Sequence, residues 1–118
     1  MTRINIKLPW PPSTNRNARV GKGQFYIPDE VKQYRHDVWA VWKESKHASL
    51  AGEVSVLILA HPPDNRRRDL DNLTQNVLNA LKGVAFGDDY TVCHLAITRS
   101  YVVNGGYLDV TLAPFVPV

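Results

Sequence analysis

Residues 53–81 read EVSVLILAHPPDNRRRDLDNLTQNVLNAL, and this stretch decides the fold. It opens with an apolar, β-branched run from Glu53 to Ala60, which is typical of a buried central strand. His61-Pro62-Pro63 ends the strand, because proline cannot donate to a ladder. A helix follows, which Gly83 should terminate. Its apolar side is formed by Leu70, Leu73, Val77, Leu78 and Leu81.

The residues before this stretch predict one strand and one helix. Apolar residues alternate with polar ones over residues 3–8, as in a half-buried strand that stops at Pro9-Trp10-Pro11-Pro12. Pro28-Asp29 opens a helix that should run to about Ser45. Between them, Ser13 to Gln24 has no periodicity and no acidic residue, and it predicts a mobile basic loop.

Two more strands are expected after the second helix. Val92 to Arg99 and Tyr107 to Leu112 both have strand character, and Asn104-Gly105-Gly106 between them is a strong hairpin signal. The expected order is therefore β-α-β-α-β-β. This order predicts an α/β mixed (α+β) fold, a single small domain over residues 1–118 with a mixed four-stranded sheet and two main helices.

Length and composition exclude several classes of protein. The 118 residues suit one domain, and 44% hydrophobic with 21% charged residues excludes a chain that is disordered throughout. The single cysteine, Cys93, excludes a disulfide scaffold. The first residues contain no continuous apolar stretch, so neither a secretory signal nor a membrane span is expected. We expect a cytoplasmic protein.

Positive charge is concentrated in two places, although the formal net charge is only +3. One is the first 35 residues, which hold Arg3, Lys7, Arg16, Arg19, Lys22, Lys32 and Arg35 against Asp29 and Glu30. The other is Arg66-Arg67-Arg68. Clustered positive charge is the footprint of a polyanion-binding protein, and a solvated basic face is the plainer interpretation.

Four aspartates flank the second helix and suggest a metal site. Asp69 and Asp71 precede it and Asp88-Asp89 follow it, so a crossover connection could bring all four together. Crowded carboxylates repel one another unless a cation is present, and Mg²⁺ binds carboxylates, waters and phosphate oxygens. The neighbouring arginines would bind phosphate. Together these groups suggest hydrolysis of a phosphodiester.

The same residues also have plainer interpretations. Asp69 could serve only as a helix cap, Arg66 to Arg68 could be solvated charge, and Asp88-Asp89 could form only a turn. A small metal-dependent phosphoesterase with a substrate other than DNA is a further alternative, although the basic segment argues against it.

The chain resembles the RusA family of Holliday-junction resolvases almost from end to end. The residues that carry the resemblance are Leu8-Pro9-Trp10-Pro11-Pro12-Ser13-Thr14-Asn15-Arg16, Pro63-Asp64, Arg66-Arg67-Arg68-Asp69-Leu70-Asp71-Asn72-Leu73, Phe86-Gly87-Asp88-Asp89 and Gly105-Gly106. The resemblance implies a small homodimeric endonuclease that depends on Mg²⁺, for which Mn²⁺ could substitute. It also implies symmetrical nicking of four-way DNA junctions.

The resemblance also implies roles for individual residues. Asp69, Asp71 and Asp89 match the catalytic metal ligands, and Asp88 matches their less critical neighbour. DNA phosphates would be held by the basic residues Arg66, Arg67, Arg68, Arg16, Arg19 and Lys22.

The chain departs from the family at Gln75, where a catalytic lysine is expected four residues after Asp71. On a helix these two positions share one face, so Gln75 should still face the site without supplying a charge. The departure leaves a second hypothesis open, a catalytically weak or inactive protein that binds junction DNA.

Overall fold

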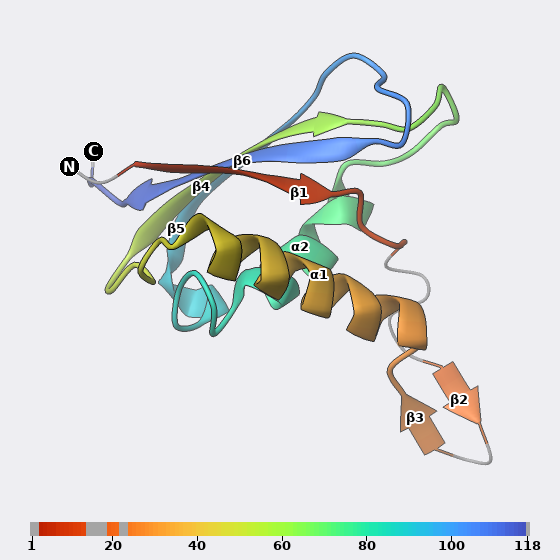
Figure 1. Cartoon of the computed structure of the whole chain (residues 1–118), viewed down its shortest axis with the longest axis horizontal. Helices are drawn as coiled ribbons and strands as arrows, with labels where there is room; N and C mark the ends of the chain where they lie inside the picture. The colour runs from red at the N-terminus through yellow and green to blue at the C-terminus, as the bar shows by residue number, and fades with distance from the viewer. Residues whose placement is uncertain (1–2, 14–18, 22–23, 118) are drawn as a thin grey trace.

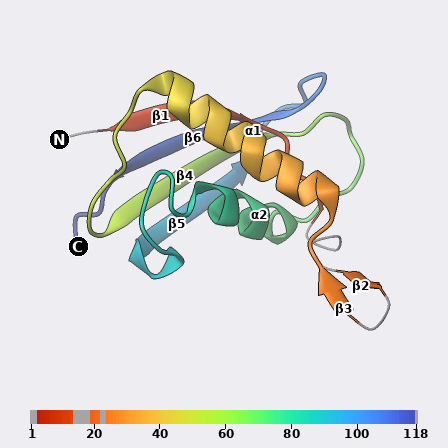
Figure 2. The same cartoon turned by 60° about the horizontal axis from the view of Figure 1, so that its bottom comes forward.

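A computed structural model describes residues 3–13, 19–21 and 24–117 of the chain. A four-stranded sheet forms one layer, and the two longer helices lie across one of its faces (Figures 1 and 2). The elements are β1 (Ile4–Pro9), β2 (Arg19–Gly21), β3 (Gln24–Tyr26), α1 (Asp29–Ser45), β4 (Val54–His61), α2 (Asp71–Leu81), the short 3-10 helix η2 (Asp89–Thr91), β5 (Val92–Arg99) and β6 (Tyr107–Pro114). The predicted mixed α+β fold is confirmed.

The sheet has the strand order β1-β6-β4-β5, so the predicted central strand β4 lies between two neighbours. It pairs antiparallel with β6 and parallel with β5. Alternate residues of each strand face the helices, because side chains of a strand alternate between the two faces of a sheet. The helix-facing residues of β4 are buried, whereas Leu57 and Leu59 on its other face are 40% and 38% exposed.

The parallel pair β4 and β5 is joined through α2, which runs back across the sheet. Parallel neighbours require such a crossover, because the chain must return to the starting edge before the second strand begins. Val77, Ala80 and Leu81 fix α2 on the sheet by burying its apolar side. Gly83 follows with a φ of +79°, which confirms it as the residue that ends the helix.

The predicted hairpin between the last two strands is wrong. Gly105 and Gly106 form a turn with positive φ, and the Gly106 amide donates to the Val103 carbonyl at 2.8 Å. The turn, however, leads β6 across to the far side of β4, where it fills the place between β4 and β1. A turn signal fixes only the local reversal of the chain, and the packing of the whole sheet selects the partner strand.

The basic segment after the proline run contains a two-stranded ribbon rather than only a loop. β2 pairs antiparallel with β3 and projects beyond the end of α1 (Figure 1). Arg16 and Lys22 lie outside the described residues. Arg19 begins β2, and its predicted contact with DNA stays a prediction. Within the described part of the chain, no helix has the length and apolar character needed to cross a membrane.

Candidate active site

The loop between β4 and α2 is organised around the carboxylate of Asp64. Its Oδ1 accepts hydrogen bonds from the Arg66 amide at 2.9 Å and from Arg68 Nη1 at 2.8 Å, while Oδ2 pairs with Arg66 Nη2 at 3.2 Å. Arg99, at the end of β5, donates from Nη2 to the Arg68 carbonyl at 2.6 Å. These bonds hold the arginine-rich loop in one shape and attach it to the sheet.

The hydrogen bonds from Arg68 and Arg66 hold the pKa of Asp64 well below its ordinary value. A lowered pKa in the folded state means that the carboxylate contributes stability above its unfolded pKa of about 4, and that this contribution disappears as the pH falls further. We therefore expect Asp64→Asn to lower the melting temperature slightly at pH 7, and we expect its difference from the wild type to be smaller near pH 2. Thermal melts at both pH values measure this, and a difference that widens in acid would contradict it.

The three arginines of the loop have different environments. Arg66 and Arg68 are both paired with Asp64, with side-chain exposures of 82% and 22%. Arg68 also lies over the indole of Trp10, its Cζ 5.7 Å from the ring centroid. Arg67 is exposed and has no ion-pair partner among the residues described in the structure. Of the three, Arg67 is therefore the one whose charge is not already paired within the described part of the chain.

Asp69 does not cap α2, contrary to the alternative raised from the sequence. The N-cap position is occupied by Leu70, and no side chain makes the capping hydrogen bond. Only the backbone carbonyl of Asp69 takes part, accepting from the Asn72 amide at 3.2 Å. The side chains of Asp69 and Asp71 are both exposed, so their carboxylates are accessible at the N-terminal end of α2.

Asp88 and Asp89 lie at the other end of the same helix. Asp89 Oδ2 is 3.8 Å from Lys82 Nζ, and Lys82 directly follows the last residue of α2. The register of β4 and β5 also places these aspartates at this end. Val92, which follows them in the chain, pairs with Val54 at the edge where both strands begin. An 11-residue helix is about 16 Å long, so the two aspartate pairs are separated by roughly that distance.

The expectation that the crossover gathers all four carboxylates within one chain is therefore wrong. A crossover between parallel strands returns the chain to the edge where the first strand began, whereas Asp69 and Asp71 follow the edge where β4 ends. Across the described ranges, no three side chains of histidine, cysteine, aspartate or glutamate are placed to hold one metal ion together. Each end of α2 supplies two carboxylates, which is the donor type that Mg²⁺ prefers but only part of a site.

Gln75 lies one turn after Asp71 on α2 and is exposed, as Asp71 is. The structure thus agrees with their predicted position on one helix face. Lys82, which directly follows this helix, is held at its opposite end beside Asp89. It cannot replace a lysine at position 75 within the same protomer.

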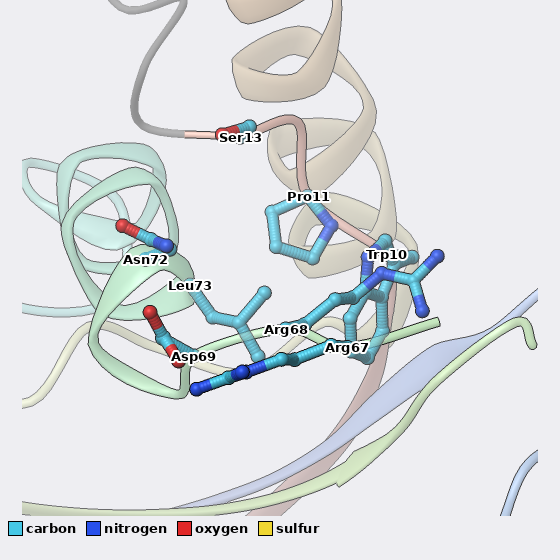
Figure 3. A pocket seen from close by; sticks show the side chains of 8 residues that line it. All are labelled: Trp10, Pro11, Ser13, Arg67, Arg68, Asp69, Asn72 and Leu73. Atoms are coloured by element: carbon cyan, nitrogen blue, oxygen red, sulfur yellow. The ribbon is translucent and has the colours of Figure 1, made fainter. Parts of the chain in front are cut away.

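Trp10 is the residue whose place at the site was not evident from the sequence. Trp10, Arg67, Arg68 and Asp69 line one pocket together, between the proline segment, the arginine-rich loop and the start of α2 (Figure 3). The run Pro9-Trp10-Pro11-Pro12 indicated the end of a strand, but nothing local indicated that residues nearly sixty positions later would lie against it.

Comparison with known proteins agrees with these features. The family model described as Endodeoxyribonuclease RusA matches residues 9–112. The chain is 39% identical to a crossover junction endodeoxyribonuclease RusA of Shigella sonnei, 40% to one of Enterobacteria phage 82 and 38% to one of Escherichia coli strain K12. Each alignment spans 114 residues and covers 95% of both chains. Because this similarity extends over almost the whole fold, the chain belongs to the RusA family of endodeoxyribonucleases.

Proposed function

We propose that this protein is a magnesium-dependent, structure-selective endonuclease that resolves four-way DNA junctions by paired phosphodiester nicks. Membership of the RusA family carries the proposal. The relatives, which align with this chain over 95% of their length, are named crossover junction endodeoxyribonucleases. The exposed carboxylates beside Arg67 support it, since this combination suits an ion and a phosphate. Branched DNA is the partner, Mn²⁺ can replace Mg²⁺, and the protein acts in the cytoplasm.

The separation of the two aspartate pairs supports a homodimer as the active form. A two-fold axis across the middle of α2 would place the N-terminal end of one helix beside the C-terminal end of its partner. Asp69 and Asp71 of one protomer would then join Asp88 and Asp89 of the other, and the symmetry would complete two sites at once. Two sites related by a two-fold axis match the two opposed strands that a resolvase must cut.

Within each site the residues divide the chemistry between them. Asp69, Asp71 and Asp89 would hold the ion, and Asp88 would support them. The bound ion would supply a water of lowered pKa and would stabilise charge on the phosphate. Arg67 would contact the phosphate, while Arg66 and Arg68, both paired with Asp64, would keep the loop in place. The basic residues Arg16, Arg19 and Lys22 would also bind DNA phosphates.

A cleavage assay tests the proposal directly. The protein is incubated with a labelled immobile four-way junction or a linear duplex of matching sequence, each in Mg²⁺ and in EDTA. The expected result is paired nicks near the crossover, only on the junction and only with Mg²⁺. Equal cutting of the duplex, or cutting in EDTA, would contradict the proposed function.

Gln75 favours a second candidate, a junction-binding protein with weak or no turnover. Loss of a cation near developing negative charge costs on the order of 2–4 kcal/mol, or about a hundredfold or more in rate. We therefore expect Gln75→Lys to raise the single-turnover cleavage rate by about a hundredfold. Gln75→Leu is the neutral control and should bring no gain. If Gln75→Lys cuts no faster than the wild type, position 75 does not limit the chemistry.

A further inference from the structure

The pocket in Figure 3 has a volume of about 410 Å³ and combines two kinds of lining. Trp10, Pro11 and Leu73 give it an apolar side, and Arg67, Arg68 and Asp69 bring charged groups to the same space. Pockets that bind small molecules measure roughly 300–1,000 Å³ and have this mixed character. It adjoins the predicted metal site, because Asp69 belongs to both.

The wall that carries Trp10 is held in place by two side chains from the helices. The Tyr34 hydroxyl on α1 donates to the Pro9 carbonyl at 2.9 Å, and Asn76 Nδ2 on α2 donates to the Pro12 carbonyl at 2.8 Å. Tyr34 and Asn76 are 5% and 2% exposed. Burial raises the pKa of the Tyr34 hydroxyl, with the charge of Asp37 as a lesser cause, so Tyr34 keeps its proton and remains a donor. The proline segment is thus fixed against both helices.

The opposite wall is also fixed. Arg68 is anchored by Asp64 at 2.8 Å, and its guanidinium lies over the Trp10 indole. The ring and the guanidinium are therefore held beside each other by contacts within the protein. Both groups stack readily on nucleobases, while the exposed Arg67 carries the charge that a phosphate requires.

We infer that this pocket receives a single nucleotide of the DNA strand, with its base taken out of the duplex stack. The base would contact the side formed by Trp10, Pro11 and Leu73, and the adjoining phosphate would contact Arg67 beside Asp69. Unstacking costs least where a base is already poorly held, and the crossover of a branched DNA interrupts the continuous stacking of a duplex. The inference rests on the proposed function and adds a recognition step to it: the pocket selects DNA in which a base can leave the stack.

Binding measurements in EDTA, where no cleavage occurs, test this pocket separately from the chemistry. Loss of one stacked base weakens binding about 5- to 150-fold, so Trp10→Ala should raise the dissociation constant for the junction by that factor for each occupied pocket. Trp10→Phe should retain most of the affinity because it keeps an aromatic face. Trp39→Ala is the matched control, since Trp39 lies 44% exposed on α1 and does not line the pocket.

The salt dependence separates stacking from phosphate binding. Trp10→Ala should leave the slope of log affinity against log salt unchanged. Arg67→Gln should reduce the magnitude of that slope by about 0.9 for each protomer bound to the junction, the value for one lost phosphate contact. A slope that changes with Trp10→Ala instead would contradict a base-stacking role.

A scan with abasic nucleotides identifies the base itself. Removing the base at one position near the crossover on each of the two opposed strands should reproduce the loss seen with Trp10→Ala. The two changes combined should weaken binding no further, because both remove the same contacts. Fully additive losses at every position would overturn the inference, as would wild-type affinity of Trp10→Ala. Melting curves show whether Trp10→Ala still folds. If Trp10→Ala does not fold, the fluorescence of Trp10 is measured instead in the double variant Trp39→Phe/Trp42→Phe, with and without the junction. An emission that the junction leaves unchanged overturns the inference.

The proposed function and this inference fail in different ways. A protein that shows the abasic effect but leaves the junction uncut in Mg²⁺ supports the pocket and contradicts the endonuclease. Normal resolution together with wild-type binding by Trp10→Ala contradicts the pocket alone.

Discussion

Mixing Asp71→Asn with Asp89→Asn should restore nicking that neither variant shows alone. In the proposed dimer, each site takes Asp71 from one protomer and Asp89 from the other. A heterodimer of the two variants therefore has one doubly substituted site and one intact site. The roughly 16 Å between the two ends of α2 is the reason to expect shared sites.

The amount and the pattern of restored activity are both defined. Random exchange of subunits gives about half heterodimers, each with one intact site, so about a quarter of all sites should be active. These dimers should nick one strand of a junction without the paired nick on the opposed strand. Denaturing gels of a junction labelled on each strand in turn distinguish the two products.

A second mixture provides the control. Asp69 and Asp71 lie at the same end of α2, so a heterodimer of Asp69→Asn and Asp71→Asn has one substitution in each site. That mixture should stay as inactive as its components. If the Asp71→Asn and Asp89→Asn mixture also stays inactive although its subunits have exchanged, the proposed sharing of sites between protomers is wrong.

The largest loss from a single substitution should come from Asp71→Asn. The amide nearly preserves the shape of the side chain but removes the negative charge that an Mg²⁺ ligand provides. Loss of several kcal/mol of transition-state stabilisation corresponds to a fall in cleavage rate of about 10²- to 10³-fold. The affinity for the junction, measured in EDTA, should not decrease, since the substitution removes no contact with phosphate.

Asp37→Asn is a suitable comparison for this loss. Asp37 lies on α1, where its carboxylate accepts a hydrogen bond from Gln33 at 2.8 Å, and it does not line the pocket beside Asp69. It should cut at the wild-type rate. An Asp71→Asn protein that resolves junctions as fast as Asp37→Asn would remove Asp71 from the catalytic machinery.

Much of the fold could be predicted because its signals are local. The alternation of Ile4, Ile6 and Leu8 reflects the two faces of a strand, and all three are buried in β1. The helical spacing before Gly83 likewise marks one buried side of α2. Hydrophobic period and turn chemistry act over a few residues, and both can be read from neighbouring positions.

Which strands pair depended on the whole sheet. Asn104-Gly105-Gly106 predicted a reversal, and the chain does turn there, but β6 pairs with β4 and β1 rather than with β5. A hairpin signal contains no information about which other strands lie beside the two that it joins. Here β5 pairs in parallel with β4, and β6 lies on the other side of β4. The error came from treating a local turn as evidence for a pairing over long range.

The sequence by itself determined the kind of chemistry: which residues carry carboxylate and guanidinium groups, and which segments form strands and helices. Only the tertiary structure decided where those groups lie. It placed Asp69 and Asp89 at opposite ends of α2, engaged Arg66 and Arg68 with Asp64, and brought Trp10 beside the arginine-rich loop. The physical reason is that side-chain chemistry and backbone preference belong to single residues and their neighbours, whereas distances between remote residues arise only when the sheet and helices bury a common core.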